Sequence, residues 1–210
     1  MWGAEPGSAR IIIAGTATEV NRFSRCCERN IRIIQANVPS QELSYPTPLP
    51  EYHHPRMRVS PILPNLYLGP EPSLDEDFAA LQTLKITAIL SVQDGEDRPD
   101  GGIEAERMAA MGRNIVFTNV PVRDFDRLQL VRRLPDCVAA LADLIDAGHT
   151  VYVHCSAGIN RSPTVVVAYL CRHLGWNLDR SLAHVTAMRV CVPDATVIQK
   201  VRWGSAANES

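Results

Sequence analysis

The sequence predicts an α/β fold with a mainly parallel central sheet flanked by helices. Short apolar segments of strand type alternate with longer amphipathic segments along the chain, which is the pattern of β-α-β units. The composition is that of a globular protein, with 46% hydrophobic and 21% charged residues among 210. No internal repeat is visible in the sequence, which disfavours solenoid and propeller folds.

The first part of this alternation follows a proline-rich stretch. Residues 66–69 are a short apolar run that ends at Gly and Pro, as strands often do. Residues 74–84 place apolar side chains at helical spacing and predict a helix. Residues 86–92 are rich in aliphatic and β-branched side chains, which predicts a buried strand. Glycine and proline then mark 93–102 as a loop.

The same order continues towards the C-terminus. The expected elements are a helix over 103–111, a strand over 114–122, a helix over 128–147, a strand over 151–153, and helices over 163–174 and 178–188. The long helix carries Leu, Val and Ile on one face and is ended by Gly148. Pro163 suits the first turn of the helix that it opens.

We expect one folded domain with a tail on either side. Nine of the fifteen prolines lie between residues 39 and 72. Proline lacks the backbone donor that a helix interior or a central strand needs, so this stretch predicts a linker without a long helix or a central strand. We divide the chain into an N-terminal tail and linker at 1–56, disordered or targeting in character, a folded domain at 57–203, and a C-terminal tail at 204–210.

Charge and cysteine content narrow the function classes. The formal net charge is −2, so no basic surplus indicates nucleic-acid binding. No apolar run approaches the roughly 18–20 residues of a membrane span. Six scattered cysteines, without metal-ligand spacing, predict neither a zinc site nor a disulfide framework. They favour an intracellular compartment, the cytoplasm first, with a plastid or another organelle left open. The sequence does not indicate an oligomeric state.

The segment VYVHCSAGINRS at residues 151–162 carries the strongest chemical signal. It predicts a strand, a tight loop and a helix start. Such a loop turns several amide N–H groups towards one point at the carboxyl end of a strand, and the helix dipole adds positive potential there. This geometry neutralises an anion without a metal or a cofactor. The predicted phosphate-binding loop consists of Ser156, Ala157, Gly158, Ile159, Asn160 and Arg161.

Cys155, at the base of this loop, is the candidate nucleophile. The amide donors, the helix N-terminus and Arg161 all favour its thiolate form. Arg161 can hold two phosphate oxygens in a fork. Ser162 can donate a hydrogen bond to the sulfur when it leaves. His154 is expected to orient the loop through hydrogen bonds and to tune the thiol, without itself transferring protons. The segment therefore predicts phosphoryl transfer through a phospho-cysteine intermediate.

A thiolate mechanism also needs an acid for the departing alkoxide or phenoxide, supplied from a separate loop. Asp124 and Asp126 follow a predicted strand and precede Cys155 by 31 and 29 residues. Either carboxylate can serve by chemistry alone. Asp126 can instead cap the next helix or remain solvated.

The segment resembles the cysteine-dependent phosphatases. Their signature H-C-x-x-G-x-x-R-S is matched at His154, Cys155, Gly158, Arg161 and Ser162. This resemblance implies a protein-phosphatase fold with a Cys-x5-Arg loop. The domain length and the entry at 64–69 are similar to those of small, atypical dual-specificity phosphatases, whose shallow pocket admits phosphotyrosine and phosphoserine or phosphothreonine. The spacing in these enzymes favours Asp124 as the acid.

A partial resemblance to plant glucan phosphatases lies in two other segments. Residues 123–126 with the helix that follows them, and the motif R-x-C-x-P at 189–193, are similar to segments of these starch-directed enzymes. Phe125 then corresponds to an aromatic that packs on glucan rings, and it is a candidate substrate contact. Residues 57–62 and 98–102 lack the further aromatic platforms that sugar faces need.

Three hypotheses follow. The leading one is a dual-specificity protein phosphatase that acts on phosphoprotein, and the alternative is a glucan phosphatase that acts on phosphoglucan. A third, of a different class, is a catalytically inactive phosphate-binding scaffold, which is disfavoured because Cys155, Arg161 and Asp124 are all present. The sequence leaves open a regulatory disulfide to Cys155.

Overall fold

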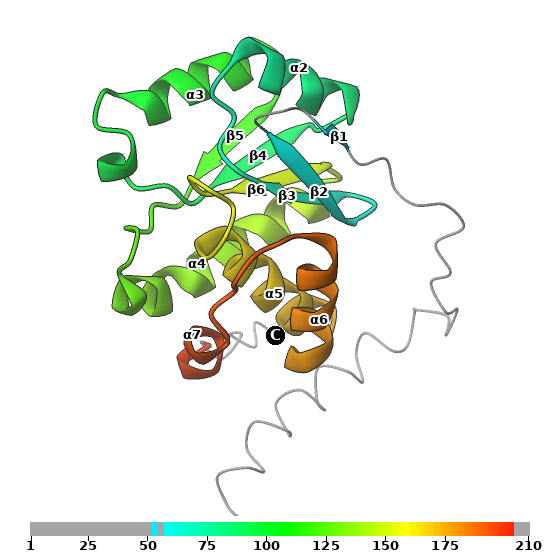
Figure 1. The fold of residues 1–210 in the computed structure, drawn as a ribbon, viewed down its shortest axis with the longest axis vertical. Coiled ribbons are helices and arrows are strands. Elements are labelled where there is room, and N and C mark those ends of the chain that lie inside the picture. Colours follow the sequence, from blue (N-terminus) through cyan, green and yellow to red (C-terminus); the bar gives the residue numbers. More distant parts are fainter. Residues whose placement is uncertain (1–51, 54–56, 204–210) are drawn as a thin grey trace, which may run out of the picture. The chain divides into compact units, whose positions relative to one another are not determined.

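The structure, a computed structural model, describes residues 52–53 and 57–203. Its centre is a six-stranded sheet (Figure 1). The strand order across the sheet is β1 (Tyr52–His53), β2 (Arg58–Leu63), β3 (Leu66–Gly69), β6 (Val151–His154), β4 (Ala88–Ser91) and β5 (Val116–Asn119). Strands β3, β6, β4 and β5 are parallel, and β1 and β2 pair antiparallel. The predicted α/β class with a mainly parallel sheet is confirmed.

Strand β6 lies between β3 and β4 and sets the position of the signature loop. His154 is opposite Gly69 on β3 and opposite Ser91 on β4. The amide of Val92 continues the ladder by donating to the carbonyl of His154 at 3.0 Å. The carboxyl ends of three parallel strands therefore meet where Cys155 begins the loop, at the edge where open α/β sheets bind ligands.

Helices α4 (Arg127–Asp146) and α5 (Arg161–His173) cover one face of the sheet, and α7 (Ala195–Lys200) packs against both helices. Leu68 and Leu90 point from the sheet into their apolar core. The side chains of this face alternate with those of the other face, because successive residues of a strand point to opposite sides.

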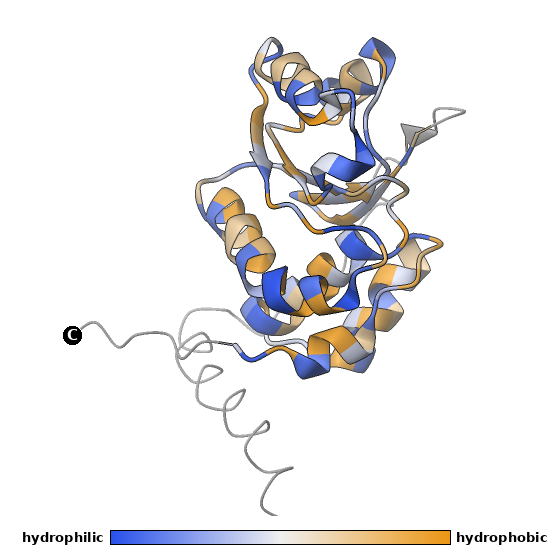
Figure 2. Cartoon of the chain, turned by 90° about the vertical axis from the view of Figure 1, so that its left-hand side faces the viewer, coloured by the Kyte–Doolittle hydropathy of each residue, from blue (hydrophilic) through white to orange (hydrophobic). Residues whose placement is uncertain are grey.

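The opposite face packs against α2 (Asp75–Thr83) and α3 (Gly102–Met111). Tyr67, Ile89 and Tyr152 point into this second apolar cluster from neighbouring strands. Hydrophobic and hydrophilic residues alternate along the helices (Figure 2), as expected where each helix buries one side and exposes the other.

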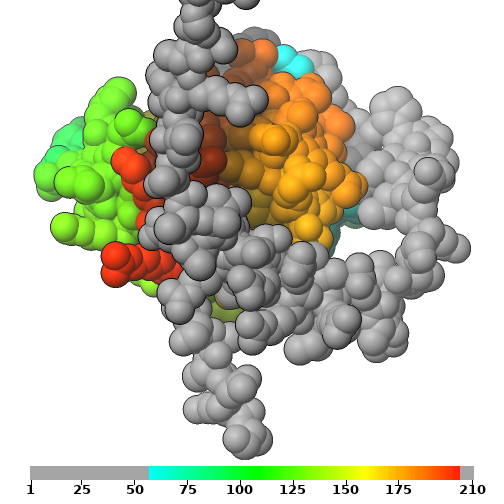
Figure 3. All heavy atoms as spheres, turned by 90° about the horizontal axis from the view of Figure 1, so that it is seen from below, coloured from blue at the N-terminus to red at the C-terminus, as the bar shows by residue number. Residues whose placement is uncertain are grey.

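Helix α6 (Leu178–Met188) packs against α5 and β2. A ring nitrogen of His184 on α6 lies 2.8 Å from the carbonyl of Ile62 on β2. In the view from below, α7 lies beside α4 (Figure 3). The guanidinium of Arg127, the first residue of α4, is 2.7 Å from the carboxylate of Asp194, which precedes α7.

Strand β2 corrects the prediction that the proline-rich stretch holds no central strand. It contains Pro61 and lies between β1 and β3. The two described residues of β1 pair with Val59 and Arg58, so neither of them lies opposite Pro61. The pairing with β3 also shifts its register between Pro61 and Leu63. A missing N–H is tolerated at such an irregular site.

Other elements differ from the prediction in extent. Strand β5 is shorter than the predicted 114–122, and α7 and a 3-10 turn, η1 (Gly95–Asp97), were not predicted. Pro163 lies in the first turn of α5, as expected. The predicted tails at 1–56 and 204–210 lie outside the described residues, apart from Tyr52 and His53. The proposed domain limits therefore stay predictions.

Candidate active site

Gly158 shapes the loop that follows Cys155. Its φ is +64°, a conformation that side chains with a Cβ rarely adopt. A Cβ at this position would also overlap the backbone carbonyl of Gly69 on the neighbouring strand. The loop can therefore lie against β3 only with glycine here.

The backbone carbonyls of the loop accept hydrogen bonds from outside it. The Ser156 carbonyl accepts from the amide of Glu71 at 3.2 Å, and the Ile159 carbonyl accepts from the amide of Val192 at 2.7 Å. Within the described residues, none of the amide N–H groups of 156–160 donates to a protein acceptor. The loop thus presents unpaired N–H donors beside the N-terminus of α5, which is the arrangement of an anion-binding nest.

Arg189, which follows α6, holds the outer side of the loop. Its guanidinium donates to the carbonyls of Gly158 at 2.7 Å, Ala157 at 3.0 Å and Arg58 at 2.7 Å. Burial lowers the pKa of Arg189 from its ordinary value. The two hydrogen bonds to Gly158 and Ala157 hold these loop carbonyls outwards, and the third ties Arg189 to β2.

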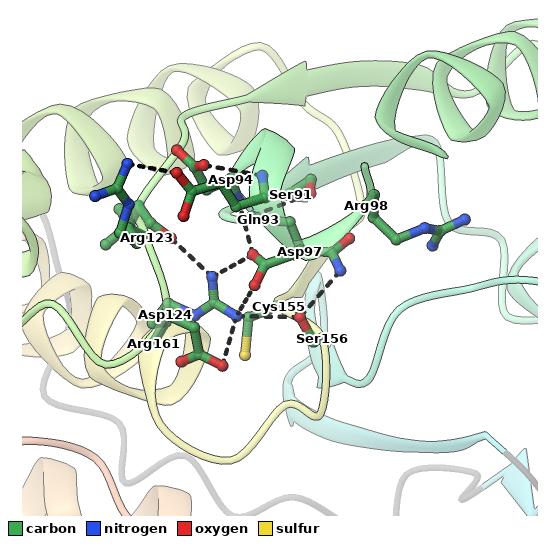
Figure 4. Close-up of polar contacts among 12 residues, drawn as sticks. Ser91, Gln93, Asp94, Asp97, Arg98, Arg123, Asp124, Cys155, Ser156 and Arg161 are labelled. Carbon is green, nitrogen blue, oxygen red and sulfur yellow. Dashed lines mark hydrogen bonds and ion pairs between the residues drawn. The ribbon is translucent and has the colours of Figure 1, made fainter. Parts of the chain in front are cut away.

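Cys155 is buried, with 3% of its surface exposed, and lies at the start of the loop (Figure 4). The hydroxyl of Ser162, in the first turn of α5, donates to the sulfur at 3.3 Å. Ser162 is itself fully buried. A hydroxyl donor in this position stabilises negative charge on the sulfur.

Arg161 contacts residues from three different loops of the candidate site. Its NH1 donates to Asp97 at 2.6 Å and to the carbonyl of Val122 at 2.7 Å. Its NH2 lies 3.1 Å from the hydroxyl of Ser156 and 3.2 Å from Asp124. Its Nε is buried without a hydrogen-bond partner among the described residues. The edge that carries Nε therefore remains available to an oxyanion.

Charge dominates the surroundings of Arg161. Burial acts to lower the pKa of this guanidinium, but the hydrogen bond that it donates to Asp97 and its electrostatic interactions with Cys155, Asp97 and Asp124 raise the pKa above its ordinary value. Arg161 therefore keeps its positive charge while only 2% of its surface is exposed.

Asp124 lies in the loop between β5 and α4, and 38% of its side chain is exposed. Phe125 beside it has a φ of +58° and is 96% exposed. Asp126 accepts a hydrogen bond from the amide of Gln129 at 2.8 Å and so caps α4. The structure thus separates the two carboxylates: Asp126 caps a helix, and Asp124 points towards Arg161.

A polar network flanks the loop on the side of β4. Gln93 donates to the hydroxyl of Ser156 at 3.1 Å and also to the carboxylate of Glu71. Arg98 lies 3.0 Å from the same carboxylate. The hydroxyl of Ser156 is therefore held between Gln93 and Arg161, as Figure 4 shows.

His154 and Glu106 form a buried pair behind the loop. Nε2 of the imidazole lies 2.7 Å from Oε1 of Glu106, and neither side chain is exposed. The two atoms are in close polar contact, but the geometry is not that of a hydrogen bond. The prediction for His154 assigned it no such partner.

The structure brings the predicted site residues into one place, with Cys155, Ser162 and Arg161 at the loop and Asp124 against Arg161. Sequence reasoning missed the residues that support them, which are Gln93, Asp97, Glu106 and Arg189. Asp97 had a usable signal, since its segment follows β4 at the same sheet edge as the loop. For Glu106 the signal was its place between Ile103 and Ala110 on the apolar side of a helix.

The described residues contain no group of three or more His, Cys, Asp or Glu side chains that could hold a metal ion. Their four cysteines, at 137, 155, 171 and 191, are free thiols. No helix in the described ranges combines the length and the apolar character needed to cross a membrane.

Residues 66–201 match the model of the dual specificity phosphatase catalytic domain. The chain belongs to this family. The match spans the strands, helices and loops that form the site described above, from β3 to the end of α7.

Curated proteins with similar sequences carry several different names. The phosphoglucan phosphatase LSF1 of Arabidopsis thaliana is 33% identical over 164 residues, which cover 77% of this chain and 27% of that protein. Laforin of Mus musculus is 32% identical over 152 residues, which cover 66% of this chain and 46% of laforin. Protein phosphatase Slingshot homolog 3 of Mus musculus is 31% identical over a region that covers 69% of this chain and 21% of that protein. The chain spans less than half the length of these relatives.

Solved structures share the dual specificity phosphatase fold at lower identity. The crystal structure of Tk-PTP in the active form has a TM-score of 0.54 at 19% identity, covering 67% of this chain and 90% of that chain. The crystal structure of Cydia pomonella PTP-2 phosphatase has a TM-score of 0.55 at 18% identity. The match covers 67% of this chain and 86% of that chain. The predicted protein-phosphatase fold is therefore confirmed.

Proposed function

We propose that the protein is a cysteine-dependent dual-specificity phosphatase that hydrolyses phosphate monoesters through a phospho-cysteine intermediate. The observation that carries this proposal is the loop at 156–160, whose amide N–H groups have no protein acceptor, next to the unpartnered Nε of Arg161. A phosphate group placed there would accept hydrogen bonds from the loop amides and from Nε of Arg161.

In the first step the thiolate of Cys155 attacks phosphorus in line with the leaving oxygen. The loop amides and Arg161 hold the equatorial oxygens as charge develops on them. Asp124 donates its proton to the leaving alkoxide or phenoxide. Its 3.2 Å contact with Arg161 supports this role.

In the second step water attacks the phospho-cysteine. Asp124, now ionised, accepts the proton of that water, and inorganic phosphate leaves. The hydrogen bond from Ser162 to the sulfur, 3.3 Å long, stabilises the thiolate that is released. The enzyme then returns to its starting state.

Phosphoprotein is the substrate class that we favour. Sugar rings bind on exposed aromatic faces. Among the Phe, Tyr and Trp residues of 57–203, only Phe125 is exposed. A single platform suits a phosphorylated side chain in a peptide better than a continuous glucan chain. An intracellular location stays part of the proposal, and the plastid remains open because LSF1 is named as chloroplastic.

Phosphoglucan is the second candidate, and a specific observation favours it. Phe125 is 96% exposed beside Asp124. Two relatives, LSF1 and the amyloplastic DSP4 of Castanea sativa, are named phosphoglucan phosphatases. Phosphate release from solubilised amylopectin, measured beside release from phosphotyrosine and phosphothreonine peptides, separates the two substrates. A Phe125→Ala variant that loses glucan activity alone would favour phosphoglucan.

The enzymatic proposal itself is tested with a generic aryl phosphate. The wild-type protein should hydrolyse it, and Cys155→Ser and Arg161→Ala should not. A wild-type protein that binds phosphate or vanadate but hydrolyses none of these substrates would instead be a phosphate-binding scaffold.

A further inference from the structure

The segment 123–126 carries Asp124 and contains no buried residue. Val122, just before it, is fully buried, and its carbonyl accepts a hydrogen bond from Arg161 at 2.7 Å. Phe125, in the middle of the segment, is 96% exposed and has a φ of +58°, a conformation that bulky residues rarely adopt. Apolar packing therefore does not hold the segment beyond Val122, and the position of Asp124 depends on polar contacts.

Arg123 makes one of these contacts at the start of the segment. Its NH2 donates a hydrogen bond to Oε1 of Glu96 at 2.7 Å. Glu96 belongs to the 3-10 turn η1, which follows β4. The side chain of Arg123 is 53% exposed and that of Glu96 is 68% exposed. This pair joins the segment that carries the candidate acid to a second loop of the site.

Turn η1 is itself fixed to the signature loop. Asp94 caps the turn by accepting from the amide of Glu96 at 3.1 Å, and the amide of Asp94 donates to Asp97 at 2.8 Å. Asp97 in turn accepts from NH1 of Arg161 at 2.6 Å, in a buried ion pair. Glu96 is therefore a firm attachment point, because a shift of the turn that carries it would disturb the buried pair.

These contacts close a ring. Glu96 is next to Asp97 in η1, and Arg123 is next to Asp124. Arg161 contacts both Asp97, at 2.6 Å, and Asp124, at 3.2 Å, and Figure 4 shows both carboxylates directed at its guanidinium. When Asp124 turns its carboxyl group towards a leaving oxygen, its contact with Arg161 is lost. The hydrogen bond between Glu96 and Arg123 then still ties the segment to η1.

We propose that Glu96 is a positioning residue that holds Asp124 over the leaving oxygen through its hydrogen bond with Arg123. Glu96 acts through Arg123, so replacing it leaves Asp124 and the phosphate-binding loop chemically unchanged. This inference rests on the proposed phospho-cysteine function. It adds a residue outside the signature motif that controls proton transfer to the leaving group.

Two aryl phosphates with different leaving groups test the proposal in the full chain. Phenyl phosphate releases a poor leaving group and needs the proton of Asp124, whereas p-nitrophenyl phosphate depends on it much less. The ratio kcat/KM compares the free enzyme with the transition state in which the leaving group departs. We expect Glu96→Gln to lower kcat/KM for phenyl phosphate about fivefold, the upper range for one exposed ion pair. The loss for p-nitrophenyl phosphate should be at most about twofold.

Glu104→Gln is the matched control, since Glu104 is 67% exposed and pairs with Arg107 at 3.1 Å. It should react with both substrates at the wild-type rate. Arg123→Gln should give the same selective loss as Glu96→Gln. The double variant should lose no more than Arg123→Gln alone, because the two changes remove one interaction. A role of Glu96 in folding alone would instead lower both substrates to the same extent.

Equal losses for the two substrates in Glu96→Gln, or wild-type values for both, overturn the proposal while the wild type is active, because the acid is then positioned without Glu96. A double variant whose loss is the product of the two single losses overturns it as well. A wild-type protein that hydrolyses neither aryl phosphate contradicts the proposed function, and the positioning role falls with it.

Discussion

Asp97 and Arg161 form a buried ion pair across 64 residues of sequence, with NH1 and Oδ2 2.6 Å apart. Only 3% of the Arg161 side chain and 10% of the Asp97 side chain are exposed. Asp97 also accepts a hydrogen bond from NH2 of Arg161 at 3.3 Å, and Nε is left without a partner in the described part of the chain. Asp97 therefore fixes the orientation in which Arg161 would meet a phosphate.

Asp97→Asn should reduce both stability and turnover. Removing one partner of a buried pair leaves a buried charge uncompensated, at a cost of about 3 kcal/mol, and a guanidinium displaced by about 1 Å can lower the rate roughly 100-fold. Urea denaturation and kcat/KM on an aryl phosphate measure the two effects. Asp100→Asn, exposed in the same loop, should change neither. Wild-type values for Asp97→Asn would show that the pair does not orient Arg161.

Asp124→Asn should lower kcat on substrates with poor leaving groups by roughly 10²–10⁴-fold, since no proton is supplied to the departing oxygen. The loss should be smaller for p-nitrophenyl phosphate, whose phenoxide leaves without full protonation. Asp126→Asn is the control, because asparagine also caps helices and Asp126 bonds to the amide of Gln129. A larger loss for Asp126→Asn than for Asp124→Asn would reverse the assignment of the acid.

Arg189→Met should weaken the loop. It removes three hydrogen bonds to the carbonyls of Gly158, Ala157 and Arg58, and each buried acceptor left unsatisfied costs about 1–3 kcal/mol. We expect a lower melting temperature and a fall in kcat/KM on an aryl phosphate. Arg133→Met, which breaks an exposed pair with Asp136, serves as the control. A normal kcat/KM in Arg189→Met would mean that the loop holds its shape alone.

Cys137 and Cys155 should differ sharply in reactivity. Burial raises the pKa of Cys137 from 9.0 to about 12, so the native protein should not be alkylated there at pH 8 while Cys155 reacts. The folded state keeps this proton to higher pH than the unfolded chain does. Stability should therefore fall as the pH rises from about 9 towards 12, by up to about 1.4 kcal/mol per pH unit from this group. Urea denaturation of Cys137→Val should show a smaller fall over that range.

Local sequence patterns predicted much of the fold, but they did not predict most of the residues that support the site. The strand at 151–153, the helix opened by Pro163 and the loop between them have strong local signals and were predicted where they occur. Pro61 misled the prediction for β2, because whether a strand tolerates proline depends on which neighbouring strand lies opposite it. That information is tertiary and cannot be obtained from spacing along the chain.

The candidate site shows the same division. The residues from His154 to Ser162 form one motif in a single segment, so their chemistry could be inferred together. Asp97, Glu106 and Arg189 reach the loop from distant segments, and each residue type is common in exposed positions elsewhere in the chain. Only the folded sheet distinguishes a buried Glu106 from an exposed Glu104 two residues earlier.

The most direct test of the account is to trap the intermediate. Rapid acid quench of the protein during hydrolysis of an aryl phosphate, followed by mass analysis of peptides, should show one phosphoryl group on the peptide that contains Cys155. The Asp124→Asn variant should accumulate more of it, because hydrolysis of the intermediate needs that carboxylate. Steady hydrolysis without phosphorylated Cys155, together with full activity in Cys155→Ser, would contradict the account.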